Sequence, residues 1–473
     1  MKKKFYLTSA LAYVNAPPHI GHAMQFVRAD VVARYRRLKG DDVFFLAGTD
    51  EYGSKVYKTA KTENISPKEL ADKNAKKFKL LDKLLNISSD GFIRTTDKKH
   101  AFNAQKIWGL LEKNGDIYKK KYQGLYCVGC ESFKTEKDLI DGKCPDHQKE
   151  PEIIEEENYF FKLSKYSKII EAKIKEDKIK IIPASKKNET LAFLKRGLND
   201  ISFSRLKEVL PWGIPVPNDN SQIIYVWADA LTGYLFPFKY WPADLHIIGK
   251  DNLKFHAVYW PAMLLASKLP LPKKIYIHGF ITSGGLKMSK SIGNVIDPFE
   301  MLEKYGVDAL RYYLLREIPA YEDGDFTEER FKERYNGELA NGLGNFTARV
   351  LTLASRDTKL QIHPNDASII KKIKYAKKII NQKLEEFKFN EALAVIWELI
   401  SFGDNYVNQI APWKIENEKE KSKVIFNLVA LLKEIAGLLQ PFLPQTSEKI
   451  LKNIKISGKA VKVKKGEILF PRI

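Results

Sequence analysis

Two histidines near the N-terminus are the first residues whose types and spacing could do chemistry. The run Pro18-His19-Ile20-Gly21-His22 follows a buried apolar segment and opens a stretch with helical periodicity. Imidazoles three residues apart share one helix face, and the free amides and dipole of a helix N-terminus attract anions. Gly21 would leave room for a flat group to approach the backbone. The run predicts a site for a nucleotide's phosphates, although two histidines that only pack a helix start would look the same.

A second run with the same possible target lies late in the chain. Gly284-Gly285-Leu286-Lys287-Met288-Ser289-Lys290-Ser291 combines two glycines, which can act as a hinge, with two lysines that can reach a polyphosphate as mobile charges. Taken alone, a solvated loop in a Lys-rich protein explains this run better. The sequence contains no Gly-x-x-x-x-Gly-Lys loop, which argues against a P-loop nucleotidase.

All three cysteines of the chain lie close together and form a third constellation. Cys127 and Cys130 are followed by Cys144 and then by His147, a Cys-x-x-Cys and Cys-x-x-His spacing. Three thiolates and one imidazole make a closed tetrahedral zinc site, with no open position for catalysis. The alternative is free thiols beside a chance histidine. The spacing favours a structural zinc ion that pins a small knuckle with little core of its own.

The elements that must position the two nucleotide motifs form a βαβ unit. Buried strands are predicted at 5–12 and 42–47, with a helical stripe over 19–39 between them and Gly40 at the helix C-terminus. Such a unit implies a parallel sheet with a right-handed crossover. Because ligands bind beyond the carboxyl ends of parallel strands, residues 10–22 and 49–53 should face one crevice.

The periodicity then changes along the chain. Residues 118–159 are rich in Cys, Gly and charge and resemble an inserted module, after which strands alternating with helices are predicted to resume. These strands are placed at 223–227, 245–248 and 275–278. The sheet is therefore expected to be split by the insertion. From about Asp325 onward apolar residues step by three and four, which predicts a separate helical bundle.

The composition narrows the class of protein. The 473 residues carry 79 Lys and Arg against 58 Asp and Glu, a formal net charge of +21. This charge favours polyanionic partners, although a Lys-rich proteome would raise the charge of any protein. Apolar residues at 44% suffice for packed cores, and the length suggests about three domains. No stretch approaches the roughly 18 consecutive apolar residues of a membrane span, so a membrane protein is excluded.

The N-terminus mimics a short signal peptide. Met1-Lys2-Lys3-Lys4 is followed by apolar residues as far as Val14, but Thr8, Ser9 and Asn15 interrupt them. Three cysteines cannot form a disulfide framework and indicate a reducing compartment. We therefore expect a cytoplasmic protein.

Together and in this order, the two nucleotide motifs resemble the signatures of class I aminoacyl-tRNA synthetases. Within that class, one knuckle and the lack of a large editing insertion argue against the isoleucine, valine and leucine enzymes, and the surrounding residues resemble the methionyl-tRNA synthetase family in its single-knuckle form. Seven further segments carry the likeness: Ser9-Ala10-Leu11-Ala12-Tyr13, Gly48-Thr49-Asp50-Glu51-Tyr52-Gly53, Glu156-Glu157-Asn158-Tyr159-Phe160, Trp212-Gly213-Ile214-Pro215-Val216-Pro217, Tyr225-Val226-Trp227-Ala228-Asp229-Ala230, Gly249-Lys250-Asp251 and Leu469-Phe470-Pro471-Arg472-Ile473.

The resemblance implies an α/β fold: a split Rossmann-type parallel sheet with an inserted zinc-knuckle connective domain, followed by an all-α anticodon-binding helical bundle. The expected parts are the first half of the catalytic domain at 1–117, the connective insertion at 118–215, the second half at 216–282, a loop and stem-contact region at 283–330, and the anticodon-binding domain at 331–473.

The same resemblance assigns the site residues. The methionine pocket would be lined by Ala10, Leu11, Tyr13, Trp227, Ala230, Tyr234 and His256, with Asp50 holding the ammonium. ATP would be bound by His19, Gly21, His22, Gly249, Asp251, Lys287, Met288, Ser289 and Lys290. Of these, His19, His22, Lys287 and Lys290 would be catalytic by stabilising charge on the phosphates, with Mg²⁺ assisting, and Asp251 would hold the ribose. A polarizable thioether favours aromatic contacts, so the pocket fits methionine.

Asn252 departs from the family pattern, whereas residues in the helical region match it. Asn252 stands where an aliphatic residue is expected, and a polar amide there must find a partner or leave the pocket wetter. In the helical region Asn345, Arg349 and Trp413 match the family's anticodon-reading residues. Single-stranded bases are read by stacking on aromatics and by hydrogen bonds to their edges. Helix capping for Asn345 and a core position for Trp413 are the alternatives.

The implied reaction joins methionine to its tRNA, initiator or elongator, through methionyl-adenylate. Two other functions stay open: a different class I enzyme such as a cysteinyl-tRNA synthetase, and a non-catalytic RNA-binding protein built on a decayed synthetase. Intact His19, His22, Lys287 and Lys290 argue against the second. The chain ends at Ile473 without an appended tRNA-binding domain, so a monomer is expected.

Overall fold

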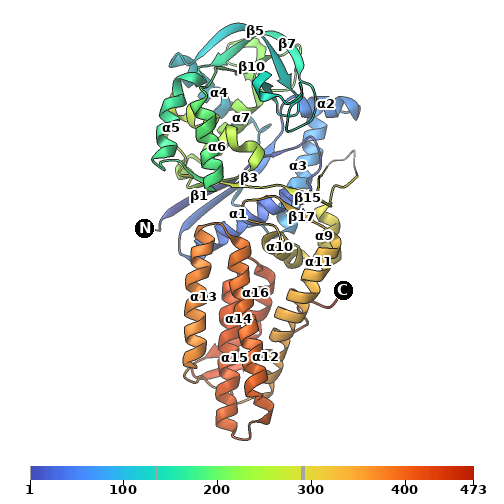
Figure 1. Ribbon diagram of the computed structural model, residues 1–473, viewed down its shortest axis with the longest axis vertical. Coiled ribbons are helices and arrows are strands. Elements are labelled where there is room, and N and C mark those ends of the chain that lie inside the picture. The colour runs from blue at the N-terminus through green and yellow to red at the C-terminus, as the bar shows by residue number, and fades with distance from the viewer. Residues whose placement is uncertain (1, 135, 289–292) are drawn as a thin grey trace. The chain divides into compact units, whose positions relative to one another are not determined.

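The structure is a computed structural model, and it describes residues 2–134, 136–288 and 293–473. The chain forms two compact units. The first comprises Met1–Ala29 and Arg36–His278, and the second comprises Asp30–Tyr35 and Gly279–Ile473. In Figure 1 the first unit runs from blue to green, and the second continues through yellow and orange to red. Within the described ranges, every helix is too short or too polar to cross a lipid bilayer.

A seven-stranded sheet is the centre of the first unit. Its strands pair in parallel in the order β2-β3-β1-β13-β14-β8, and β4 also pairs with β3. The strands are β1 (Lys4–Ser9), β2 (Ala12–Tyr13), β3 (Asp42–Asp50), β4 (Gly91–Arg94), β8 (Lys180–Ile182), β13 (Leu245–Gly249) and β14 (Lys274–His278). The predicted parallel α/β sheet is confirmed.

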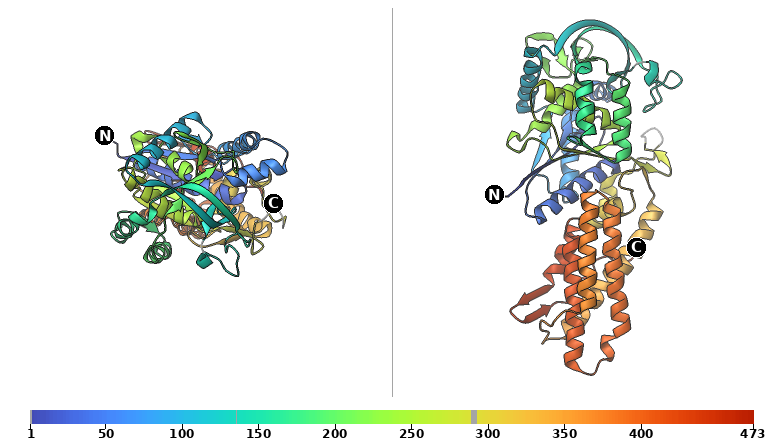
Figure 2. Two further views of the ribbon diagram at one scale, coloured as in Figure 1. Left: turned by 90° about the horizontal axis from the view of Figure 1, so that it is seen from above. Right: turned by 60° about the vertical axis from the view of Figure 1, so that its left-hand side comes forward.

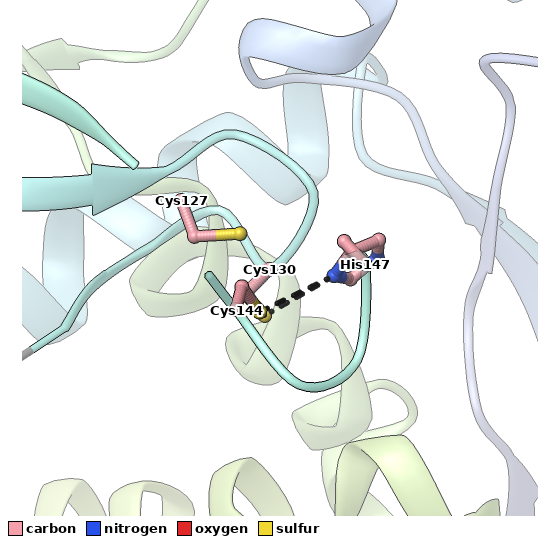
Figure 3. Close-up of side chains that lie close together, drawn as sticks. All are labelled: Cys127, Cys130, Cys144 and His147. Carbon is pink, nitrogen blue, oxygen red and sulfur yellow. Dashed lines mark hydrogen bonds between the residues drawn. The ribbon is translucent and has the colours of Figure 1, made fainter. Parts of the chain in front are cut away.

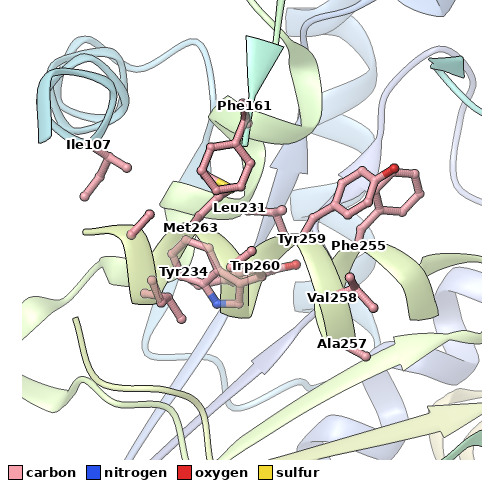
Figure 4. Packing of buried hydrophobic residues seen from close by; sticks show 14 of the residues in the cluster. Ile107, Phe161, Leu231, Tyr234, Phe255, Ala257, Val258, Tyr259, Trp260 and Met263 are labelled. Carbon is pink, nitrogen blue, oxygen red and sulfur yellow. The ribbon is translucent and has the colours of Figure 1, made fainter. Parts of the chain in front are cut away.

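Helices pack around this sheet and form the first unit's core with it. They are α1 (Ile20–Leu38), α2 (Ser54–Thr62), α3 (Pro67–Leu84), α4 (Lys98–Lys113), α5 (Ser167–Lys175), α6 (Ala184–Lys195), α7 (Val226–Ala230) and α8 (Trp260–Ala266). Residues Asp30–Tyr35 of α1 are the exception, because they belong to the second unit. Trp108 and Trp260 are buried at 2% and 1% exposure. Figure 4 shows Trp260 among Phe161, Leu231 and Met263 of the same core.

Helix α1 carries the first histidine motif, and its ends are explained by local chemistry. It starts one residue after His19, in agreement with the predicted 19–39, and ends at Leu38 with Arg36 and Arg37 in its last turn. Cations are favourable at a helix C-terminus. Gly40 follows with a φ of +90°, a left-handed conformation that a residue without Cβ adopts at little cost.

Two small antiparallel sheets correct the predicted organisation. One has the order β6-β5-β7-β9, with β5 (Ile117–Cys127), β6 (Ser132–Lys134), β7 (Glu152–Phe161) and β9 (Ile201–Ser202); the other has the order β10-β12-β11, with β10 (Ser204–Leu206), β11 (Pro215–Val216) and β12 (Asp219–Ile224). The prediction of a strand of the parallel sheet at 223–227 is therefore wrong in part. Strand β12 ends at Ile224 outside the parallel sheet, and helix α7 starts at Val226. A short apolar run does not reveal which sheet it joins.

Strand β8 also departs from the prediction. It lies within 118–215, the range predicted as the connective insertion, yet it pairs in parallel with β14. Three residues are too few to show a periodicity, so the pattern could not reveal this return to the main sheet. The boundary between the compact units falls between His278 and Gly279, four residues before the predicted boundary at 282. The predicted domain limits themselves stay predictions.

The second unit is mainly helical, as predicted. Its helices are α9 (Pro298–Tyr305), α10 (Val307–Arg316), α11 (Glu328–Arg334), a π-helical stretch (Tyr335–Gly344), α12 (Asn345–Arg356), α13 (Ala367–Glu385), α14 (Phe389–Ile410), α15 (Glu418–Leu439) and α16 (Pro444–Lys452). Side chains of Asp297, Asp366 and Asn417 accept backbone N–H groups at the starts of α9, α13 and α15, which satisfies amides that a helix start leaves unpaired.

The expectation that the chain is helical from Asp325 onward is wrong at both ends. Strand β17 (Gly324–Phe326) pairs with β15 (Ile281–Ser283), which also pairs with β16 (Leu286–Lys287). Near the C-terminus β18 (Ile454–Ser457) and β19 (Ala460–Val463) form a hairpin, which projects from the helices in the right-hand view of Figure 2. Gly458 in its turn has a φ of +58°, a conformation that favours glycine.

Candidate active site

The carboxyl edge of the parallel sheet gathers residues from four strands. Ala10 directly follows β1, Asp50 ends β3 and Gly249 ends β13. Tyr13 in β2 lies opposite Asp50 in register. Because parallel strands end on the same edge of a sheet, the structure brings these predicted residues together.

His19 and His22 form one compact pair at the start of α1. Their ring centroids are 3.9 Å apart. The backbone N–H of Gly21 donates to Nδ1 of His19 and that of His19 donates to Nδ1 of His22, each at 3.1 Å. A backbone amide can only donate, so each neutral ring carries its proton on Nε2. Both imidazoles are thereby fixed as donors through their outer nitrogens.

Burial decides the charge of this pair. It lowers the pKa of His19 to about 4, and it lowers that of His22 well below the usual value, with His19 as a further cause. At neutral pH both rings are uncharged. The predicted phosphate site therefore offers hydrogen-bond donors rather than two positive charges.

The structure gives a different reason for a glycine at position 21 from the one predicted. A Cβ built on it would lie 2.9 Å from Cε1 and 3.0 Å from Nδ1 of His19. The space beside its backbone is thus occupied by the His19 ring. Glycine is needed here so that this ring can fold back onto the amide.

A hydrogen-bonded chain crosses the predicted amino-acid pocket. The Nδ1–H of His256 donates to the carbonyl of Asn252 at 3.0 Å, so its Nε2 accepts the hydroxyl proton of Tyr234 at 2.9 Å. The Tyr234 oxygen in turn accepts the backbone N–H of Leu11 at 3.3 Å. Burial lowers the pKa of His256 to about 4, which keeps this tautomer uncharged. Asn252 thus contributes its carbonyl to the pocket through His256.

Aromatic rings form a second wall beside this chain. Trp227 stacks on Phe255, with centroids 3.6 Å apart and planes 5° from parallel. The indole Nε1 of Trp227 is buried without a partner among the described residues. Ala230 lies on the same short helix as Trp227 and is 4% exposed. Phe255 was not predicted, although it directly precedes His256 in the sequence.

Asp50 is buried at 2% exposure and is incompletely paired. Its Oδ1 has no hydrogen-bond partner among the described residues. Burial raises the pKa of its carboxyl well above the usual value, and the neighbouring Asp229, Glu131 and Glu51 raise it further. A desolvated carboxylate among like charges is strongly stabilised by a cation.

Sequence reasoning missed two further buried acids beside Asp50. Asp229 is 0% exposed, and its Oδ1 lies 3.2 Å from Nε2 of His100. Because burial lowers the pKa of His100 to about 4, this contact is a hydrogen bond of a neutral ring and not an ion pair. Glu131 accepts the hydroxyls of Tyr13 and Tyr126 at 3.1 and 2.6 Å. Asp229 lies inside a quoted motif, and Glu131 follows Cys130, but neither position signals burial.

The remaining nucleotide residues lie in both units. Asp251 is exposed, and a Cβ at Gly249 would lie 2.7 Å from its Oδ1, so glycine lets the carboxylate fold over the strand end. In the second unit Lys287 ends β16 and Met288 follows it half-buried. The predicted Ser289 and Lys290 lie outside the described residues.

The predicted metal ligands converge (Figure 3). Nitrogen or sulfur atoms of Cys127, Cys130, Cys144 and His147 all lie within 4.8 Å of one another. The sulfur of Cys130 is 3.5 Å from that of Cys144 and 3.4 Å from Nδ1 of His147. A Cβ at Gly129 would lie 2.4 Å from the His147 ring, so this glycine lets the ring reach the cluster. The arrangement could hold a metal ion.

The three residues predicted to read tRNA all lie in the second unit. Asn345 is exposed at the start of α12, which continues the π-helical stretch without a break, so helix capping is not its role. The Nη1 of Arg349 donates to Asp404 at 3.3 Å and to Asn408 at 3.0 Å. Trp413 lies in a 3₁₀ turn, Pro412–Lys414, and is 56% exposed, so it is not a core residue.

Known proteins of one kind are similar to this chain in sequence and in fold. Residues 5–152 and 136–351 match the family described as tRNA synthetases class I (M), and residues 366–470 match the anticodon-binding domain of tRNA ligase. A methionine–tRNA ligase of Caldanaerobacter subterraneus subsp. tengcongensis is 42% identical, over 100% of this chain and 79% of that protein. A methionine–tRNA ligase of Brucella suis is 40% identical, over 95% and 91%.

Solved structures of the same kind of protein superpose on this chain. Mycobacterium tuberculosis methionyl-tRNA synthetase in complex with methionyl-adenylate superposes with a TM-score of 0.91 at 37% identity, covering 95% of this chain and 94% of that one. The free form of the enzyme from the same organism gives a TM-score of 0.86 at 33% identity, covering 100% and 99%.

Replacing Asp50 by Asn is expected to stabilise the protein at high pH. The pKa of Asp50 is raised on folding, so its carboxyl contributes stability below the ordinary value near 4, and this contribution is lost as the pH rises through the raised value. Asn cannot ionise, so Asp50→Asn should gain about 1–3 kcal/mol at pH 8, and the gain should shrink toward pH 5. Thermal unfolding at several pH values measures it. The control is Asp141→Asn at an exposed position, and a variant no more stable than the wild type at pH 8 contradicts the assignment.

Proposed function

This chain belongs to the methionyl family of class I tRNA synthetases, and we propose on that premise how its residues join methionine to tRNA. In the first step a carboxylate oxygen of methionine attacks the α-phosphorus of ATP. The bond from that phosphorus to the bridging oxygen breaks, and pyrophosphate leaves. In the second step a ribose hydroxyl of the tRNA's 3′-terminal adenosine attacks the carbonyl carbon of the adenylate. The bond from that carbon to the phosphate oxygen breaks, AMP leaves, and the hydroxyl proton passes to the departing phosphate.

The unpaired carboxylate of Asp50 is the observation that carries this proposal. A buried carboxylate with one free oxygen is a ready partner for the ammonium of an amino acid. Tyr13 faces it across the β2–β3 pair. The side chain of methionine would extend past Ala10 and Leu11 toward Trp227, Ala230, Tyr234 and His256, where aromatic rings suit a polarizable sulfur.

His19 and His22 are proposed to act without transferring protons. Their Nε2–H groups would donate to phosphate oxygens, where negative charge develops as pyrophosphate departs. Because Nδ1 of each ring is already held by a backbone amide, the donors need not reorganise during the reaction. The work of these residues is therefore positioning and charge stabilisation, and no covalent enzyme intermediate is required.

The other nucleotide contacts are inferred from the family resemblance. Asp251 would hold the ribose beside Gly249, and Lys287 and Lys290 would neutralise the leaving pyrophosphate, with Met288 and Ser289 in the same segment. Mg²⁺ bound with ATP would share in that neutralisation. Asn345, Arg349 and Trp413 would read the anticodon of initiator and elongator methionine tRNA. A cytoplasmic monomer remains a prediction from the sequence.

Zinc is the metal that best fits the cysteine cluster. Zn–S bonds of about 2.3 Å at tetrahedral angles separate two sulfur atoms by about 3.8 Å, close to the 3.5 Å between Cys130 and Cys144. Four protein ligands leave no open position, so the ion would be structural. Bound there, it would tie the end of β5 to the segment that carries Cys144 and His147.

The direct test of the function is methionine-dependent exchange of pyrophosphate into ATP. His22→Asn should slow this exchange by about 10²- to 10³-fold, the loss expected for one charge-stabilising donor, while methionine affinity stays unchanged. His22→Gln is the matched control, because its amide nitrogen reaches the place of Nε2 and should retain part of the rate. No exchange with any amino acid would refute the proposal, and exchange with cysteine alone would indicate a different synthetase.

Removing one metal ligand should release the ion but spare the sheet. A structural metal contributes folding free energy mainly to its own module, and the parallel sheet has its own core. We expect one zinc ion per wild-type chain by metal analysis, little in Cys127→Ser, and faster proteolysis near 127–147 in that variant. Lys143→Ala, at an exposed position between the ligands, should keep its zinc. A zinc-free wild type would contradict the assignment.

Loss of the exposed indole should separate tRNA selection from adenylate formation. Trp413→Ala should lower kcat/KM for charging methionine tRNA by about 5- to 150-fold, the value of one base–aromatic stack. Pyrophosphate exchange, which involves no tRNA, serves as the reference. Tyr375→Ala removes another exposed aromatic side chain from the same unit and should charge normally. Wild-type charging by Trp413→Ala would mean that the anticodon is read elsewhere.

A further inference from the structure

Glu131 is a buried acid in the turn that joins β5 to β6. It directly follows Cys130 and is 2% exposed. A buried carboxylate normally has a cation beside it, but across the described residues Glu131 forms no ion pair. Its φ is +51°, a left-handed conformation that is unfavourable for a residue with a Cβ. Such strain persists only where the surrounding contacts hold the residue in place.

Neutral groups donate hydrogen bonds to both oxygens of this carboxylate. The backbone N–H of Lys55 donates to Oε1 at 2.6 Å, the hydroxyl of Tyr13 donates to Oε1 at 3.1 Å, and that of Tyr126 donates to Oε2 at 2.6 Å. The hydroxyl of Tyr225 also donates to the backbone carbonyl of Glu131. Donors of this kind let a carboxylate be buried without a cation. The side chain and the backbone of Glu131 are thus both fixed.

One of these donors belongs to the start of a helix. Lys55 is the second residue of α2, and a helix leaves the N–H groups of its first turn unpaired. The preceding Gly53 has no side chain that could accept them. Glu131 supplies the acceptor from the turn between β5 and β6, and it contacts Tyr13 through the same oxygen.

Gly53 also makes the contact between Glu131 and Tyr13 possible. A Cβ built on Gly53 would lie 2.1 Å from the hydroxyl oxygen of Tyr13 and 3.1 Å from Oε1 of Glu131. Any larger residue would therefore push these two groups apart. The φ of Gly53 is +98°, which is a further reason for glycine at this position. The backbone here leaves room for the hydroxyl and the carboxylate to meet.

Tyr13 connects Glu131 to the proposed methionine pocket. Its hydroxyl has one proton, which is shared between the carbonyl of Tyr52 at 2.7 Å and the carboxylate of Glu131. Tyr13 lies opposite Asp50 in the register of β2 and β3, and Asp50 is the residue proposed to hold the ammonium. The far end of the Tyr13 ring is therefore anchored by groups outside the pocket, while its backbone lies beside the proposed ammonium site.

We propose that Glu131 is a positioning residue for methionine, because it fixes the ring of Tyr13 before the amino acid arrives. A ring that is already ordered loses little rotamer freedom on binding, whereas a free ring must be ordered at the cost of affinity. Glu131 acts through Tyr13 and takes no part in the bond changes. This inference rests on the proposed function, because it takes methionine as the ligand beside Tyr13.

The test is a double-mutant cycle on methionine affinity, measured with the full chain by titration calorimetry. Glu131→Ala removes the acceptor, and Tyr13→Phe removes the hydroxyl but keeps the ring. Each should weaken methionine binding by about 3- to 10-fold, the cost of ordering one side chain. The double variant should bind no more weakly than the weaker single variant, because both changes remove the same contact. In pyrophosphate exchange, kcat and the KM for ATP should stay within about twofold of the wild type.

Further variants separate this role from a general loosening of the structure. Glu131→Gln keeps an acceptor oxygen for Tyr13 and Lys55, so it should retain most of the affinity. Glu152→Ala removes an exposed carboxylate that pairs with Lys58 of α2 at 2.6 Å, and it should bind methionine as the wild type does. The metal content of each variant shows whether the cysteine cluster is intact. Should Glu131→Ala not fold, Glu131→Met takes its place, because it fills a similar volume without an acceptor.

Several results would overturn the proposal. Effects of Glu131→Ala and Tyr13→Phe that multiply would mean that the two residues act separately. Wild-type affinity in Tyr13→Phe would mean that the hydroxyl is not an anchor, whichever Glu131 variants fold. An equal loss in Glu131→Gln and Glu131→Ala would mean that the charge acts directly on the ammonium. Loss of metal together with affinity in Glu131→Ala would assign the effect to the cysteine cluster, and an equal loss in Glu152→Ala would assign it to α2. A wild type that binds no methionine would instead refute the proposed function.

Discussion

The ion pair between buried Glu51 and half-buried Arg94 is the constraint on which the proposed amino-acid site depends. Glu51 is 0% exposed and accepts two hydrogen bonds from Arg94, at 2.7 and 2.9 Å, with Thr49 as a further donor. Its backbone carbonyl accepts the indole N–H of Trp212 at 2.7 Å. These partners anchor the end of β3 through Glu51, and Arg94 also donates to Asp72 at 2.5 Å. The adjacent Asp50 is held at the same depth but left one partner short, and a rigid, unpaired carboxylate can discriminate in favour of a cation.

Desolvation has a similar effect at the proposed phosphate site and at the proposed methionine pocket. The imidazoles of His19, His22 and His256 are kept neutral by burial, and each is oriented by a backbone group: an amide that donates to the first two and a carbonyl that accepts from the third. The direction of that backbone hydrogen bond decides which ring nitrogen carries the proton. The first two rings thus present donors to the site, whereas His256 presents an acceptor to Tyr234.

Features set by local spacing were predictable from the sequence, whereas features set by long-range packing were not. The βαβ unit and the convergence of Cys127, Cys130, Cys144 and His147 were predictable because periodicity and ligand spacing are local properties. Trp413 was singled out by the family resemblance alone. Strand β8 and the hairpin β18–β19 were missed because short strands gain their stability from distant partners. Asp229 and Glu131 look like surface acids in the sequence, and only the fold places them beside Asp50. The function of Gly21 also depends on a ring that folds back, which no pattern encodes.

The two units are proposed to recognise their ligands by different physical means: buried, unpaired groups in the first unit and exposed charge in the second. A small amino acid offers few contacts, so its recognition depends on groups that are buried and unpaired in advance, the role proposed for Asp50. A polyanion is attracted by exposed lysines regardless of its sequence, so selectivity must come from elsewhere on that surface. Arg349 suggests how: its guanidinium already donates to Asp404 and Asn408. A base must replace these contacts to engage it, and only a base with correctly placed acceptors would repay their loss.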